Sequence, residues 1–225
     1  MASVRHARRE DIPTILSLIK ELADYEHELD SVLATEETLG ATVAFAPSSP
    51  QETTYTPGKP QTEPTSPSKP ARCLLLFNEA GEGVGMALYF YNYSTWRAKP
   101  GVYLEDLYVR LSERKKGYGK RLLVELAKEV VAMEGGRLEW SVLKWNEPSI
   151  KFYESIGAKA MNDWVGMRVD GDALPKLAGL LDSGYLSEML SLTICGILLP
   201  YTDSRYLGFL ASLGAFGLMG MLEAV

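Results

Sequence analysis

Apolar residues recur with helical spacing near the start of the chain. Within residues 10–27 the apolar face consists of Ile12, Ile15, Leu16, Ile19, Leu22 and Ala23. This spacing predicts an amphipathic helix, and Pro13 falls in its first turn, where the missing N–H costs little. Residues 3–7 can form a short edge strand before this helix, and a weaker helical pattern covers residues 35–45.

Further along, the pattern changes to short apolar runs separated by turns. Residues 73–79, 83–93 and 102–109 are such runs, and they predict a meander of three strands. A helix is predicted over residues 117–133, with a buried face of Leu122, Leu123, Leu126, Ala127 and Val130 and with Gly135 and Gly136 at its end. A strand (137–143), a short helix (148–156) and a strand (164–169) follow. This order predicts an α/β (α+β) domain with one mixed central sheet flanked by helices.

Two segments depart from this pattern. Residues 47–70 are rich in Pro, Ser and Thr and almost free of apolar side chains, which predicts a disordered insertion inside the domain. Residues 181–225 form an apolar C-terminal extension after the domain of residues 1–180, with an uncharged run at 206–222. Three interpretations of this extension stay open: a packed extension, a marginal membrane anchor, or non-native coding sequence.

Composition and charge exclude several classes of function. The chain of 225 residues has a formal net charge of −6, which argues against binding nucleic acid and is compatible with a cationic small substrate or with solubility alone. The cysteines Cys73 and Cys195 lie far apart, and the two histidines are His6 and His27, so no metal site is expected. The N-terminus lacks the apolar stretch of a signal peptide, which predicts a cytoplasmic protein.

The glycine-containing turn between the meander and the next helix is the segment with the clearest chemistry. It reads ERKKGYGKRLL over residues 113–123 and contains the pattern Arg114-x-x-Gly117-x-Gly119. Glycines let a ligand approach the backbone, and the free N–H groups at a helix N-terminus favour phosphate oxygens. No GK[ST] follows, and the turn follows an antiparallel meander, so neither a P-loop nor a dinucleotide-binding motif fits.

Together with three other segments, this turn resembles the GNAT superfamily of N-acetyltransferases. The segments YLEDLYV, WNEPSIKFYESIGA and KELADYE resemble the branch that acetylates diamines (spermidine and spermine) and thialysine. The resemblance implies the GNAT fold, acetyl-CoA as cosubstrate, direct acetyl transfer to a primary amine of a small diamine, polyamine or related amino compound, and a homodimer.

The resemblance also assigns cofactor-binding residues. Leu107, Tyr108 and Val109 would form the strand edge that pairs with the pantetheine arm. The turn around the pyrophosphate would consist of Arg114, Lys115, Lys116, Gly117, Tyr118, Gly119 and Lys120. Asn146 and Ser149 would lie along the cofactor near the start of the next helix.

The catalytic residues implied by the resemblance are Tyr153 and Glu105, and the amine pocket would contain Tyr25, Glu26 and Glu105. An alkylammonium must lose a proton before it can attack a thioester, and Glu105 can accept that proton directly or through a water molecule. Tyr153, a phenol, can protonate the departing thiolate, whose pKa is about 8.5 for a cysteine-like thiol. Asp106 is interpreted as a structural or surface carboxylate, and Trp140 and Trp145 as packing residues.

Two alternatives remain open at this point. The substrate could be a protein lysine or an N-terminal amine, or the chain could be a regulatory module that binds acetyl-CoA without catalysis. One departure from the polyamine branch bears on specificity: Val165 stands before Gly166, where that branch has an acidic residue, and Asp163 is out of register. This departure puts specificity for long polyamines in doubt, but not the class of reaction.

Overall fold

The computed structural model describes residues 1–48 and 58–181. The chain divides into two units, Met1–Ala158 and Lys159–Val225. The first unit contains the central sheet and all of the predicted site residues, and the second is described as far as residue 181.

The first unit is built on one five-stranded sheet with the strand order β1-β2-β3-β4-β5. The strands are β1 (Ser3–His6), β2 (Arg72–Phe77), β3 (Gly83–Ser94), β4 (Lys99–Val109) and β5 (Leu138–Trp140). The first four pair antiparallel in sequence order, and β5 pairs parallel to β4. The predicted meander and mixed sheet are therefore confirmed, although β5 is shorter than the expected strand over residues 137–143.

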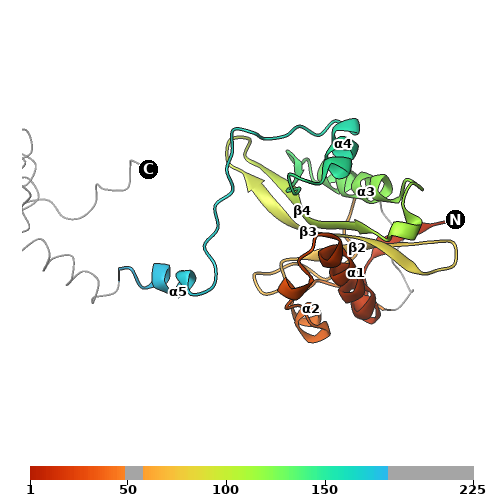
Figure 1. Cartoon of the computed structure of the whole chain (residues 1–225), viewed down its shortest axis with the longest axis horizontal. Coiled ribbons are helices and arrows are strands. Elements are labelled where there is room, and N and C mark those ends of the chain that lie inside the picture. The colour runs from red at the N-terminus through yellow and green to blue at the C-terminus, as the bar shows by residue number, and fades with distance from the viewer. Residues whose placement is uncertain (49–57, 182–225) are drawn as a thin grey trace, which may run out of the picture. The chain divides into compact units, whose positions relative to one another are not determined.

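Helices cover both faces of this sheet (Figure 1). One face carries α1 (Ile12–Tyr25) and α2 (Glu36–Thr42), and the other carries α3 (Tyr118–Ala132) and α4 (Glu147–Ser155). Short 3-10 turns are η1 (Arg9–Asp11), η2 (Leu29–Ser31) and η3 (Leu111–Glu113). Every helix expected in this unit is present.

Two hydrophobic cores lie on the two faces of the sheet. Strand β2 serves both, because alternate residues of a strand point to opposite faces: Leu75 packs with Ile15 and Leu18 of α1, whereas Leu74 and Leu76 pack on the α3 side. This double burial explains why β2 is a continuous apolar run. The helical pattern located these faces well, but it missed Leu18, which is fully buried, and included Ala127, which is exposed.

The strand expected over residues 164–169 is wrong. These residues belong to the second unit and have no strand or helix assignment there, while a short helix, α5 (Ala173–Ala178), follows. Trp164, Val165 and Met167 are all exposed. A strand needs a neighbouring strand to pair its backbone N–H and C=O groups, and an apolar sequence pattern does not provide one.

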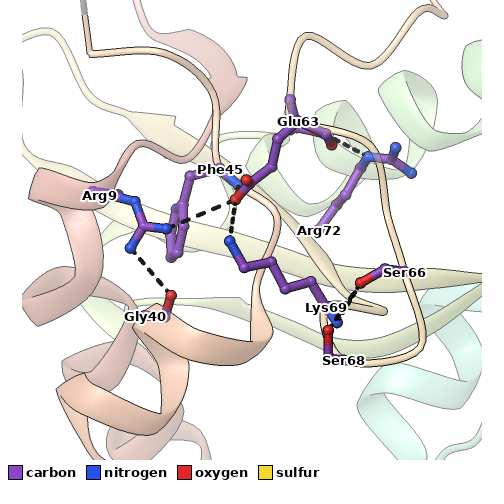
Figure 2. Close-up of polar contacts among 9 residues, drawn as sticks. Arg9, Gly40, Phe45, Glu63, Ser66, Ser68, Lys69 and Arg72 are labelled. Atoms are coloured by element: carbon purple, nitrogen blue, oxygen red, sulfur yellow. Dashed lines mark hydrogen bonds and ion pairs between the residues drawn. The ribbon is translucent and has the colours of Figure 1, made fainter.

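The described part of the Pro-rich insertion forms a hydrogen-bonded loop. Glu63 accepts hydrogen bonds from Lys69 Nζ (2.9 Å) and from the Phe45 backbone N–H (3.4 Å). It also forms an ion pair with Arg9, whose Nη2 lies 3.9 Å from Glu63 Oε1 (Figure 2). Arg72 Nε donates to Thr62 Oγ1 at 2.7 Å. These polar contacts hold the loop where apolar burial cannot, which composition alone does not reveal.

Gly58 fixes the start of this described loop against α3. Its φ is +77°, and a Cβ atom there would lie 2.5 Å from the Lys128 carbonyl oxygen and 2.7 Å from the Ala132 Cβ. Gly81 has a similar φ of +81° with nothing within 4 Å of its Cβ position. The two glycines therefore share the conformational requirement but differ in packing.

We expect Gly58→Ala to lower the free energy of unfolding more than Gly81→Ala. Both variants carry the left-handed backbone cost of roughly 1–2 kcal/mol, but only Gly58→Ala also forces the loop away from α3. Urea unfolding of the two variants beside the parent protein measures the difference. Equal losses would show that the contact between the insertion and α3 contributes nothing to stability.

Candidate functional site

A bulge in β4 sets the position of the predicted carboxylates. Leu88 of β3 is opposite Asp106, whereas its neighbour Tyr89 is opposite Leu104, so Glu105 is the extra residue. A β-bulge bends the strand and re-aims its side chains. Glu105 is exposed, while Asp106 lies in the same row as Cys73 and Leu88 and is partly buried on the α1 face.

The pairing between β4 and β5 stops just before this bulge, where β5 ends. Among the described residues, β5 pairs with β4 only from Val102 to Leu104. The rest of β4 therefore has no β5 partner, and this stretch contains Leu107, Tyr108 and Val109, the predicted pantetheine edge. An extended chain can bind such an edge by adding backbone hydrogen bonds.

The carboxyl group of Asp106 has a strongly shifted pKa. Burial, followed by the negative charges of Glu105 and Glu26, raises the pKa of Asp106 to about 6. The sequence predicted a structural or surface carboxylate at Asp106, and strand alternation alone does not reveal the bulge or the burial that raises its pKa. The strongly shifted pKa makes Asp106 a candidate for proton transfer near neutral pH.

Tyr153 is held at the same end of the sheet by aromatic packing. Its ring centroid lies 4.9 Å from that of Trp140 on β5 and 5.3 Å from that of Phe152. Burial, with a smaller contribution from the charge of Glu26, raises the pKa of Tyr153 to about 12. The phenol is therefore protonated at neutral pH, but it is a weaker acid than a thiol, whose pKa is about 8.5. Trp140 is a packing residue, as predicted.

The end of α1 connects these groups. Burial and the neighbouring Glu28 raise the pKa of Glu26, and the charge of Glu26 acts on both Asp106 and Tyr153. Since charges act strongly only at short range in a protein, Glu26, Asp106 and Tyr153 form one electrostatic group. They come from α1, β4 and α4, which are far apart in sequence.

Tyr25, the residue before Glu26, contacts the two loops predicted to hold the cofactor. Its hydroxyl donates to Asn146 Oδ1 at 3.3 Å, and the Arg114 guanidinium lies 4.7 Å above its ring. Asn146 is buried and also caps α4, since its Oδ1 accepts from the Ser149 backbone N–H at 3.4 Å. The structure thus brings Tyr25, Arg114, Asn146 and Ser149 together, whereas the sequence pattern did not indicate the contact between Arg114 and Tyr25.

The predicted pyrophosphate turn has the expected backbone geometry. Gly117 is the N-cap of α3 with φ +78°, and nothing lies within 4 Å of its Cβ position. Lys115 also has a positive φ, of 65°. The first N–H groups of α3 are left without acceptors within the helix, and Lys115, Lys116 and Lys120 are exposed around them. This turn therefore suits an anionic group.

A cavity lies elsewhere in the same unit, away from the candidate site. It has a volume of about 560 Å³ and is lined by Arg9, Phe45, Ala46, Pro47, Ser48, Gln61, Thr62 and Glu63. Figure 2 shows this region at the base of the insertion. None of the predicted site residues lines it. The candidate site is therefore defined by its side chains and by the part of β4 that has no β5 partner.

The described residues carry neither a membrane span nor a metal cluster. Within residues 1–48 and 58–181, no helix is both long and apolar enough to cross a membrane. The same part of the chain contains no group of three or more His, Cys, Asp or Glu side chains that could hold a metal ion. The run at 206–222 that raised the question of a membrane anchor lies outside the described residues, as does Cys195.

With this fold and site in place, comparison with known proteins identifies the class. Residues 39–158 match the acetyltransferase (GNAT) family, and the chain belongs to that family. It is an amine N-acetyltransferase.

Among its relatives is L-ornithine N5-acetyltransferase of Arabidopsis thaliana, 34% identical over 76% of this chain and 85% of the relative. Thialysine N-epsilon-acetyltransferase of Bos taurus is 32% identical over 78% of this chain and 96% of the relative. An integron cassette protein from V. cholerae shares the fold, with a TM-score of 0.58 and 22% identity over 79% of this chain and 97% of the other.

Proposed function

We propose that the protein transfers the acetyl group of acetyl-CoA directly to a primary amine of a small diamine, polyamine or diamino acid. The observations that carry this proposal are the free stretch of β4 beyond its pairing with β5 and the charge of Glu26, which acts on both Asp106 and Tyr153. The relatives named for ornithine and thialysine acetylation support the same substrate class.

The residues around the free stretch of β4 fit acetyl-CoA. The α3 turn around Gly117 offers backbone N–H groups and lysines to the pyrophosphate. The β4 edge from Leu107 to Val109 offers hydrogen bonds to the pantetheine arm, and Asn146 and Ser149 would lie along its other side. Acetyl-CoA supplies the activated acetyl thioester.

Acidic residues at the end of α1 and on β4 would bind and deprotonate the amine. A primary ammonium has a pKa of about 10 and must lose its proton to become a nucleophile. Glu26 and Glu105 provide negative charge that holds the cation. Asp106 is the better proton acceptor, because a carboxyl with a pKa of about 6 is ionised at pH 7 yet more basic than an ordinary aspartate. Glu105, exposed at the bulge, would pass the proton to solvent.

Tyr153 would donate its hydroxyl proton toward the sulfur that leaves. With a pKa of about 12, full transfer to a thiolate of pKa about 8.5 would be uphill by about 5 kcal/mol. An ammonium group bound beside Glu26 would offset the charge that raises the pKa of Tyr153. Substrate binding would therefore make Tyr153 a better acid.

The test is release of CoA thiol across a panel of amines. We expect turnover with at least one of putrescine, spermidine, ornithine, lysine and thialysine, and little with a lysine-containing peptide. Turnover with the peptide alone would replace the small-amine proposal by protein acetylation. Tight acetyl-CoA binding without turnover of any amine would contradict catalysis and support a regulatory module.

A further inference from the structure

The proposed mechanism leaves an exposed aromatic group at the edge of the site unexplained. The Trp145 ring lies 5.9 Å from the Tyr25 ring, tilted by 49°, and 6.2 Å from the His27 ring, at an interplanar angle of 26°. Trp145 is still 52% exposed. A tryptophan that served only for packing would bury more of its large apolar surface.

The backbone turn at the end of α1 positions Tyr25 and His27 against Trp145. His27 has a left-handed φ of 63°, a conformation that costs energy for a residue with a Cβ atom. Hydrogen bonds from the Glu28 N–H to Ala23 O (2.8 Å) and from the His27 N–H to Asp24 O (3.1 Å) stabilise the turn. As a result, Tyr25 and His27 both contact Trp145, while Glu26 between them acts on Asp106 and Tyr153.

The other side of the contact is equally well anchored. Trp145 directly precedes Asn146, which is buried and caps α4. The Glu147 N–H donates to Trp145 O at 2.8 Å. The indole is therefore held one residue from the predicted cofactor loop and beside the amine pocket, on a segment that leads directly into the helix of Tyr153.

The surroundings of Trp145 favour a cation. Aromatic faces attract ammonium and guanidinium groups through the ring quadrupole, and Arg114 already uses the face of Tyr25 in this way. Glu26 and Glu28 lie on the same turn as His27 and add negative charge. A neutral or anionic group would gain little from this combination.

We propose that Trp145, flanked by Tyr25 and His27, is the subsite for the second, non-reacting ammonium group of the substrate. This inference rests on the proposed function and deepens it. The acidic group of Glu26 and Asp106 receives the reacting amine, and the aromatic group binds the distal cation. Trp145 thereby determines specificity for substrates with two amino groups over simple alkylamines.

The experiment compares two ligands that differ only in the second amino group. Calorimetric Kd values are measured on CoA-loaded protein for 1,4-diaminobutane and for 1-aminobutane. We expect Trp145→Leu to weaken diaminobutane binding roughly 5- to 10-fold and aminobutane binding less than about 2-fold, since a cation–π contact is lost. Trp145→Phe keeps an aromatic face and should retain most of the affinity for the diamine.

The outcomes separate this subsite from the reaction itself. Equal weakening of both ligands, or an unchanged diamine Kd in Trp145→Leu, would overturn the subsite. Diamine binding that depends on Trp145 without any acetyl transfer would overturn the proposed function and leave the subsite supported. Urea unfolding midpoints of both variants verify that replacing the exposed Trp145 side chain has preserved the fold.

Discussion

Replacing Tyr153 by Phe is expected to lower kcat by about 100-fold or more while changing the Kd for CoA by less than about 2-fold. General acid catalysis contributes roughly 10²- to 10⁴-fold to a rate, and this substitution removes only the hydroxyl. The Tyr153 ring would keep its packing against Trp140 and Phe152. Steady-state kinetics with the best amine of the panel, together with CoA binding, measure both quantities.

The matched control for this variant is Tyr103→Phe. Tyr103 is a half-buried residue of β4 whose hydroxyl pairs with Ser141 Oγ at 2.8 Å, outside the proposed mechanism. Its kcat should stay close to that of the parent protein. If Tyr153→Phe turned over substrate at a similar rate, the phenol would not be the proton donor, and the role would pass to solvent or to another group.

The second large effect is expected from Asp106→Asn. If Asp106 accepts the proton of the substrate, kcat/KM of the parent protein should fall as the pH drops through about 6, because the carboxyl becomes protonated there. Asp106→Asn should lower kcat/KM at pH 8 by about 100-fold. It should also remove the fall of kcat/KM below about pH 6, the acid limb of the pH profile. A pH series of kcat/KM for both proteins tests the assignment.

Glu105→Gln is the companion variant, because it changes the adjacent carboxylate at the bulge. It should cost less activity and retain the acid limb near pH 6. The opposite result, with the limb lost in Glu105→Gln and kept in Asp106→Asn, would show that Glu105 is the base. The two neighbouring substitutions therefore decide between the assignment implied by resemblance and the one favoured by burial.

Stability provides a check that Asp106→Asn acts on chemistry and not on folding. A carboxyl whose folded pKa is raised contributes stability that is fully present below its unfolded pKa and lost as the pH rises through the folded value. For Asp106 this loss occurs between about 4 and about 6. At pH 8 the neutral amide should therefore leave the free energy of unfolding unchanged or raise it. A large loss of stability would mean that Asp106 makes an essential structural contact.

Most of the secondary structure and the glycine turn before α3 could be predicted from the sequence, because both depend on local features. The spacing of Ile15 and its neighbours predicts α1, and the short apolar runs predict the antiparallel meander. The left-handed backbone at the start of α3 needs glycine at position 117. Each of these features depends on residues only a few positions apart, so periodicity and backbone conformational preference are sufficient to find them.

Tertiary structure decided which side chains share an environment. The β4 bulge, which depends on pairing with β3, separates the exposed Glu105 from the half-buried Asp106. The pKa values of Asp106 and Tyr153 depend on burial and on Glu26, which is more than a hundred positions from Tyr153 in the sequence. Local patterns contain no information on such desolvation or on charges brought close by folding.

The same distinction explains the remaining differences. The Pro-rich composition of residues 47–70 could not reveal that Gly58 packs on α3 or that Glu63 pairs with Lys69. The apolar pattern of residues 164–169 could not provide a strand partner, and no single segment indicated the contact of Trp145 with Tyr25 and His27. Local patterns along the chain were sufficient for the helices, the meander and the glycine turn before α3. The electrostatics of the site and the aromatic group beside it required the folded structure, because both arise from contacts between segments distant along the chain.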